Sequence, residues 1–259
     1  VLIVTILLWR GTNTTARVEN VLVIGKVLVI LIFIGVGLTA IHPANYVPFI
    51  PAHKPGTDFG GWQGIFAGAA QIFLAYIGFD SIAANSAEAK DPKKTMPRGI
   101  IGSLVIATIL FVTVALVLVG MFHYSKYANN AAPAAWALLN SGHEFTSNLL
   151  SVVALVGMFT AIIGMMLAGS RLLYAFGRDG LLPKFLGKVN DKGLPNNALL
   201  VLSVIAILIG SVFSFTELAG LISAGTLIAF IIVSLGVYAL RPREGKDIPV
   251  PGFKMPLYP

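Results

Sequence analysis

Cysteine and charge are what this 259-residue sequence most clearly lacks. It contains no cysteine, which excludes disulfides and thiolate metal sites. Charged residues make up 11% of the chain, against roughly 25% in an average soluble domain. Hydrophobic residues make up 56%. These proportions predict a polytopic membrane protein, whose spans we expect to be helical because lipid offers the backbone no hydrogen-bonding partner.

The apolar segments also lack histidine. His42, His53, His123 and His143 all fall between these segments, without the spacing of metal ligands. No cofactor and no metal is therefore expected. A nucleophilic hydrolase would need a histidine or cysteine to activate a serine within the membrane. The sequence therefore predicts that the protein is not an enzyme.

Long apolar stretches occupy most of the chain and predict one transmembrane domain built from successive spans. The expected elements are a stub over 1–9, spans over 18–41, 61–87, 99–122, 147–173, 197–214 and 218–240, and a cytoplasmic link over 241–259. The stub is too short to cross a bilayer, and the chain starts within it without an initiator methionine. We therefore expect a fragment of a larger transporter.

Positive charge alternates between the loops. If the stub ends on the cytoplasmic side, the outer loops carry only Lys54 and Lys126. The other loop lysines and arginines then face the cytoplasm, which sets the orientation by the positive-inside rule. The formal charge of +7 follows from this topology. The expected partner is therefore the lipid bilayer, and no nucleic acid is expected.

A carboxylate lies within the span over 61–87. Asp80 follows Gly78 in residues 74–80 (LAYIGFD), and a charge at membrane depth is costly. Because glycine weakens a helix, we expect a break between Tyr76 and Asp80. Carbonyls freed there suit a substrate ammonium group, and the amides of the next half-helix suit a substrate anion. The alternative interpretation is structural, with Asp80 capping the broken helix or pairing with a cation.

Lys26 is a second charge inside a span, roughly 12 Å from the start of that span at helical rise. At that depth its long side chain can reach back to the membrane interface, which would make the lysine structural. The other interpretation is a buried lysine that gains and loses a proton as the protein changes state. The residues alone leave both interpretations open.

Several segments together resemble the amino acid–polyamine–organocation (APC) transporters, and most of all the cationic amino acid transporter branch. Residues 20–26 (NVLVIGK) resemble the fifth helix of that family, and 225–230 (GTLIAF) resemble its tenth. The sixth helix is matched by 74–80, followed by 87–92 (AEAKDP) and 96–97 (MP). The end of the eighth helix is matched by 171–183 (RLLYAFGRDGLLP). The resemblance covers nearly the whole chain. It implies an all-α, LeuT-like inverted-repeat fold, of which this chain would hold the end of helix four, helix five and the second repeat.

The same resemblance assigns roles to individual residues. The substrate-binding residues that it implies are Leu74, Ala75, Ile77, Gly78 and Asp80. Lys26 matches a lysine that, in proton-coupled members, takes the place of a sodium ion. The resemblance thus implies proton-coupling through Lys26.

The function implied is proton-coupled symport of an amino acid, cationic or small and neutral, across the plasma membrane by alternating access. Protons and the amino acid would be the transported partners. An exchanger of amino acids or polyamines on the same fold stays open. A membrane-embedded enzyme and a channel are less favoured, because the spans lack a catalytic dyad and carry few polar residues to line a pore.

Overall fold

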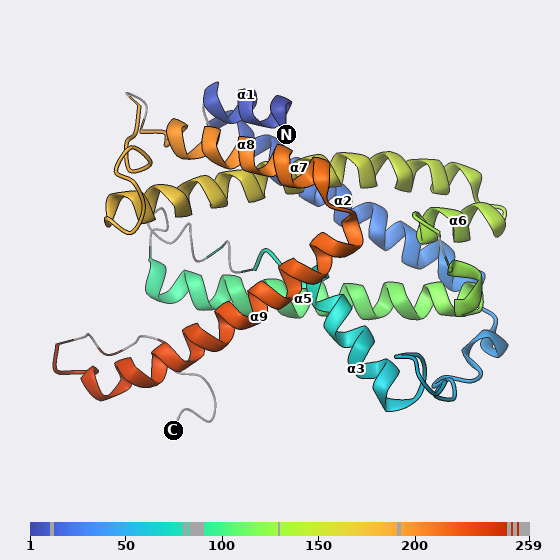
Figure 1. The fold of residues 1–259 in the computed structure, drawn as a ribbon. Coiled ribbons are helices and arrows are strands. Elements are labelled where there is room, and N and C mark those ends of the chain that lie inside the picture. The colour runs from blue at the N-terminus through green and yellow to red at the C-terminus, as the bar shows by residue number, and fades with distance from the viewer. Residues whose placement is uncertain are drawn as a thin grey trace. The chain divides into compact units, whose positions relative to one another are not determined.

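The computed structural model describes residues 1–10, 13–79, 82, 91–128, 130–190, 193–247, 250 and 253. Helices form its regular elements (Figure 1). In chain order they are α1 (Leu2–Arg10), α2 (Asn13–Thr39), η1 (Pro43–Tyr46), α3 (Gly61–Ile72), η2 (Phe73–Tyr76), α5 (Pro92–Met121), η4 (Tyr124–Tyr127), α6 (Pro133–Asn140), α7 (Glu144–Arg178), α8 (Asn196–Val212), α9 (Phe215–Leu240) and η5 (Arg241–Arg243), where η marks a 3₁₀-helix.

Within the described part of the chain, 4 helices are long and apolar enough to cross a membrane. They are Val21–Thr39, Pro92–Met121, Glu144–Arg178 and Glu217–Arg243. Helix α8 is apolar but shorter. The predicted all-helical character is therefore confirmed for these residues.

The helices extend beyond the apolar stretches that predicted them. Helix α5 begins at Pro92, ahead of the expected 99, and α7 covers 35 residues. At 1.5 Å per residue α7 is about 50 Å long, more than the about 30 Å of a bilayer core. Hydropathy marks only the lipid-embedded part of a helix, and a proline such as Pro92 is well suited to its first position. The sequence therefore underestimated how far these helices continue into the polar region.

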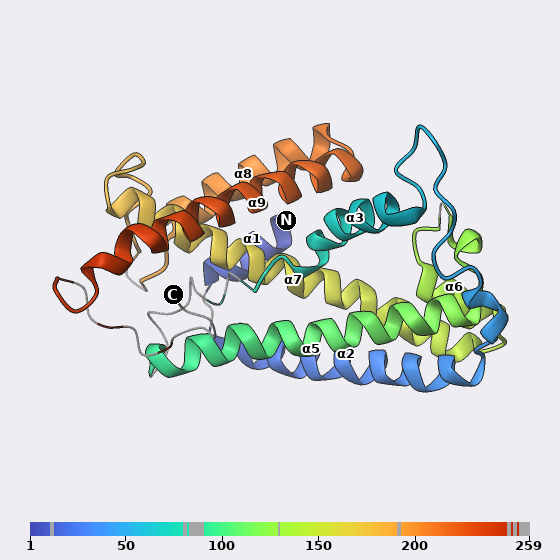
Figure 2. The same cartoon turned by 90° about the horizontal axis from the view of Figure 1, so that it is seen from below.

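The chain divides into two compact units. The first unit contains Val1–Pro51 and Ile106–Ile207, and the second contains Ala52–Val105 and Leu208–Pro259. In the first unit α7 contacts α1, α2 and α6. The C-terminal ends of α2 and α5 lie side by side there (Figure 2).

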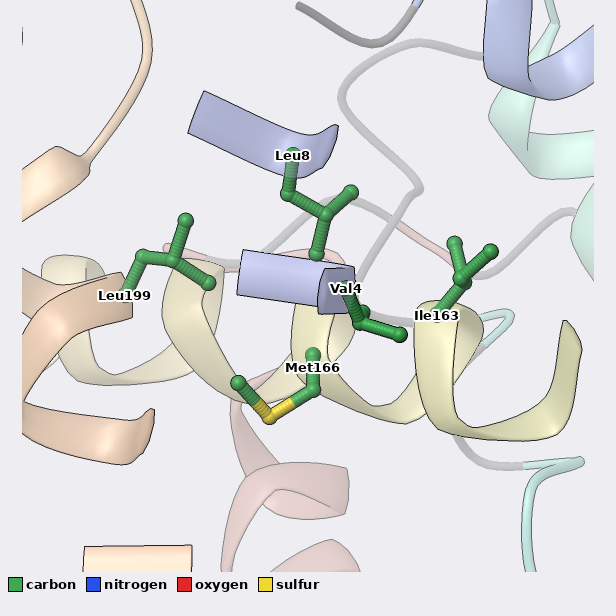
Figure 3. Close-up of a cluster of buried hydrophobic side chains, with 5 residues drawn as sticks. All are labelled: Val4, Leu8, Ile163, Met166 and Leu199. Atoms are coloured by element: carbon green, nitrogen blue, oxygen red, sulfur yellow. The ribbon is translucent and has the colours of Figure 1, made fainter. Parts of the chain in front are cut away.

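Two clusters of buried side chains hold the first unit together. In one cluster Val4 and Leu8 of α1 lie against Ile163 and Met166 of α7, with Leu199 of α8 beside them (Figure 3). In the other cluster Phe33, Val117 and Met121 pack with Ala137 and Leu138 of α6. Because lipid is as apolar as these side chains, close packing rather than escape from water favours such contacts within a membrane.

In the second unit α9 packs against α3 and η2. The start of α9 is fixed by a capping box, in which the backbone amide of Ser214 donates to Glu217 Oε2 at 2.9 Å. The hydroxyl of Ser214 accepts in return from the backbone amide of Glu217. This reciprocal pair satisfies donors that every helix leaves unpaired at its first turn.

Candidate functional site

The segment that carries the expected substrate site leaves α-helical geometry before it reaches Gly78. Helix α3 ends at Ile72 and continues as the 3₁₀-helix η2 to Tyr76. Ile77 is then extended, with φ −60° and ψ 132°. Gly78 has a φ of 122°, in the left-handed region that side chains other than hydrogen disfavour. The α-helix thus tightens into a 3₁₀ turn, and the first non-helical residues, Ile77 and Gly78, lie between Tyr76 and Asp80, where the break was expected.

We call residues 73–79, from the 3₁₀ turn through Gly78, the opened segment. Four of the predicted substrate-binding residues lie in it: Leu74, Ala75, Ile77 and Gly78. The carbonyl of Leu74 accepts from the amide of Ile77 at 3.3 Å, so this carbonyl takes part in a single 3₁₀ turn. Irregular backbone at membrane depth is tolerated where it packs within the protein or lines a cavity. The segment is therefore the first candidate site.

Asp80 lies outside the described residues, as do Ser81, Asn85 and Ser86. Phe79, which immediately precedes Asp80, accepts through its carbonyl from the amide of Ile82 at 3.4 Å. The position and the role of the Asp80 carboxylate accordingly stay predictions.

Lys26 lies in the first unit and contacts α7. Its amine donates a hydrogen bond to the hydroxyl of Thr160, a residue that is only 3% exposed. The Thr160 hydroxyl in turn donates to the carbonyl of Gly157 at 2.9 Å. Lys26 therefore bonds to a buried hydroxyl on a neighbouring helix, an arrangement that differs from the interface-seeking alternative raised by the sequence.

Gly157 allows α7 to approach the stem of Lys26. A Cβ atom added to Gly157 would lie 3.2 Å from Lys26 Cδ, closer than an ordinary contact. The ion pairs that the structure resolves among the described residues join other side chains: Lys94 with Asp91, Arg178 with Asp179, and Arg243 with Asp247. Among the described residues, then, the Lys26 amine is held by a neutral hydroxyl.

Sequence reasoning missed both Thr160 and an aromatic neighbour of the opened segment. The ring of Phe230 in α9 contacts the rings of Phe73 and Phe79, at centroid distances of 6.1 and 5.4 Å. Thr160 offered a weak signal, as a polar residue within an apolar helix. Phe230 offered none, because a phenylalanine in an apolar span is ordinary.

Among the described residues, no group of three or more histidine, aspartate or glutamate side chains could hold a metal ion. The candidate chemistry of this part of the chain consists instead of backbone groups at an opened helix and one lysine bonded to a threonine.

Residues 1–258 match the protein family described as Amino acid permease. The branched-chain amino acid permease BcaP of Lactococcus lactis is 60% identical over 259 residues, covering 100% of this chain and 56% of the relative. The methylthioribose transporter of Bacillus subtilis is 36% identical over 94% of the chain and 51% of the relative.

More distant similarity extends to transporters with cationic substrates in their names. Cationic amino acid transporter 9, chloroplastic, of Arabidopsis thaliana is 32% identical over 95% of the chain and 42% of the relative. The chain thus spans about half the length of the curated relatives that it matches.

Proposed function

The chain belongs to the amino acid permease family within the APC superfamily, a family of multi-pass membrane transporters and not of enzymes, and from that premise we propose that the protein carries branched-chain amino acids across the plasma membrane. The observation that carries the substrate class is the 60% identity, along the whole chain, to a branched-chain amino acid permease. The relative named for cationic substrates is only 32% identical. The proposal therefore narrows the expected substrate, a cationic or small neutral amino acid, to a neutral aliphatic one.

The substrate site of this proposal is the opened segment. The carbonyls around Leu74, Ala75 and Ile77 accept hydrogen bonds from the substrate's ammonium group, and the backbone at Gly78 leaves room for the ligand to approach. Asp80 adds a negative charge next to that group. In this arrangement the backbone recognises what all amino acids share, so neighbouring apolar side chains select an aliphatic substrate.

The coupling ion of this proposal is the proton, exchanged at Lys26. In its charged form the amine donates to Thr160, whose lone pairs face it because the threonine hydroxyl is itself anchored on Gly157. A neutral amine has one fewer donor and no charge, so its bond to the hydroxyl weakens. Loss of the proton thus loosens the link between α2 and α7, which connects protonation to helix movement in alternating access. The LeuT-like inverted-repeat fold, with this chain as the second repeat plus the helix before it, is part of the same proposal.

Uptake by the full-length protein in proteoliposomes tests the proposal. We expect uptake of labelled leucine, isoleucine and valine that increases with an inward proton gradient. Unlabelled arginine should compete poorly, and counterflow without a gradient separates an exchanger from a symporter. Uptake of arginine in preference to leucine would contradict the substrate class.

The same uptake experiment tests the role of Asp80 through a substitution. Because a charge at membrane depth is costly and marks functional positions, we expect Asp80→Asn to abolish or strongly reduce uptake at equal protein content. Asp91→Asn, at an exposed carboxylate paired with Lys94, is the matched control and should retain uptake. Normal uptake by Asp80→Asn would return Asp80 to the structural interpretation.

A further inference from the structure

The backbone from Phe73 to Phe79 lacks a continuous α-helical hydrogen-bond ladder to fix its shape. It passes from a 3₁₀ turn through the extended Ile77 to Gly78, whose φ is 122°. Backbone in sparsely populated conformations persists only where the surrounding structure holds it. In the second unit α9 packs against both α3 and η2, so it supplies contacts to this segment.

One ring of α9 contacts both ends of this segment. Phe73 is the first residue of η2, and Phe79 directly follows Gly78. The ring of Phe230 lies edge-on to Phe73, at 6.1 Å and 84°, and tilted against Phe79, at 5.4 Å and 50°. Both separations fall within the about 4.5–7 Å of favourable aromatic pairs. Phe230 thus contacts both Phe73 and Phe79, the residues at the two ends of the opened segment.

The position of Phe230 within α9 supports this interpretation. Ser223, Thr226 and Phe230 are partly buried and recur at helical spacing, so they form one face of α9. Ile228 and Ile231, on other faces, are 58% and 60% exposed. The Thr226 hydroxyl donates to the carbonyl of Ile222 at 2.7 Å, within its own helix. Phe230 is therefore the large side chain that this face presents at the opened segment.

We propose that Phe230 is a positioning residue of the substrate site, whose ring holds Phe73 and Phe79 so that the backbone between them keeps its opened geometry. This inference rests on the proposed function for its link to substrate. The bracing of the backbone by the ring is a separate claim, and it can be measured without any substrate.

Hydrogen exchange of the full-length protein in nanodiscs tests the bracing. We expect the amides of residues 74–78 to exchange several-fold faster in Phe230→Leu than in the unaltered protein, because leucine keeps the apolar contact but loses both ring pairs. Phe230→Tyr should restore slow exchange. Phe66→Leu is the matched control, since Phe66 lies in α3 of the same unit and is 71% exposed. Unchanged exchange in Phe230→Leu would overturn the proposal.

Uptake kinetics test the link to substrate. With the loss of two aromatic pairs we expect the KM for leucine uptake to rise by about tenfold in Phe230→Leu, with the maximal rate retained at equal protein content and with rescue by Phe230→Tyr. A merely structural residue would lower the amount of active protein and leave KM unchanged. Faster exchange with an unaltered KM would overturn the positioning role.

Failure of the proposed function has a different signature. In that case the unaltered protein itself takes up no branched-chain amino acid. Hydrogen exchange of the backbone amides alone then decides whether Phe230 braces the segment. Faster exchange in Phe230→Leu then still supports the bracing, and unchanged exchange rejects it.

Discussion

The amine of Lys26 bonds to a threonine 134 residues away in the chain, and that threonine is itself bonded to the carbonyl of Gly157. A hydrogen bond to a charged group contributes about 1.5–3 kcal/mol, so removing the Thr160 hydroxyl should weaken the hold of α7 on the Lys26 amine by an amount of that order. The hydroxyl matters here more than the shape of the side chain, because valine has the same shape without it.

The first prediction concerns this acceptor. We expect Thr160→Val to lose pH-dependent uptake as Lys26→Ala does, whereas Thr160→Ser keeps it. The measurement is leucine uptake by the full-length protein in proteoliposomes across a pH series. Thr113→Val is the control, since Thr113 also donates within its own helix, to the Ile109 carbonyl at 2.7 Å. A normal pH profile in Thr160→Val would show that Lys26 acts without its bond to Thr160.

Gly78 is a second residue whose identity follows from its geometry. A side chain at a φ of 122° is strained by about 1–3 kcal/mol. We therefore expect Gly78→Ala to change the opened backbone and raise the KM for substrate in uptake assays. Gly102→Ala provides the contrast, because nothing lies within 4 Å of a Cβ atom added there. Equal kinetics in the two variants would argue against a site at Gly78.

At the scale of the element, the C-terminal end of α5 is capped by a neighbouring loop. The amide of His42 and Asn45 Nδ2 donate to the carbonyl of Gly120, at 2.9 and 2.8 Å, and Asn45 Nδ2 also donates to the carbonyl of Met121 at 3.1 Å. A helix leaves its last four carbonyls unpaired. Because the loop after α2 supplies these donors, it ties the ends of α2 and α5 together.

A Cβ atom on Gly120 would lie 2.3 Å from Tyr46 Oη, which donates to the carbonyl of Leu116 at 2.9 Å. A glycine is therefore needed for this loop to approach α5. The close approach explains why the capping residues can reach the helix end at all.

Tyr127 also bonds to the last turn of α5, donating to the carbonyl of Leu118 at 2.6 Å. Burial raises the pKa of Tyr127 to about 12, against a smaller lowering effect of the Phe122 backbone. Because the folded pKa lies above the value of about 10 in an unfolded chain, the unfolded state loses this proton first. The stability that neutral Tyr127 contributes is thus fully present below about pH 10 and is lost between there and about pH 12.

The prediction for this element compares Tyr127→Phe with the unaltered protein. We expect Tyr127→Phe to destabilise the protein by about 1 kcal/mol at neutral pH, through one lost hydrogen bond. The difference should shrink as pH rises above about 10. Thermal unfolding of the full-length protein in detergent across that range measures it. A difference independent of pH would contradict the assignment.

At the scale of the whole molecule, membrane orientation is the property that the loop charges predict. This chain contributes no background thiol, so introduced cysteines can be labelled selectively once any cysteines elsewhere in the protein are removed. In intact cells we expect an impermeant maleimide to label Lys54→Cys and Lys126→Cys. Lys188→Cys should react only after the membrane is permeabilised. The reverse pattern would overturn the orientation given by the positive-inside rule.

The end of the helical backbone near Gly78 could be predicted from the sequence, because its signal is local. Gly78 beside an intramembrane acid indicated an opened helix, since glycine alone among residues adopts left-handed backbone without strain. The change from α-helix to 3₁₀-helix after Ile72 could not be predicted. Residues 73–76 are apolar and helix-compatible, so nothing in their own side chains distinguishes a 3₁₀ turn from an α-turn.

By itself the sequence determined that this is a helical membrane protein of the amino acid permease family. Composition and hydropathy report how each residue relates to lipid, which suffices for the helical membrane class, and the family follows from sequence similarity along the chain. The tertiary structure alone decided that Thr160 receives Lys26, that Phe230 meets Phe73 and Phe79, and that a loop caps α5. Such pairings depend on which helices lie beside one another and at what rotation, and those quantities are set by the packing of many side chains together.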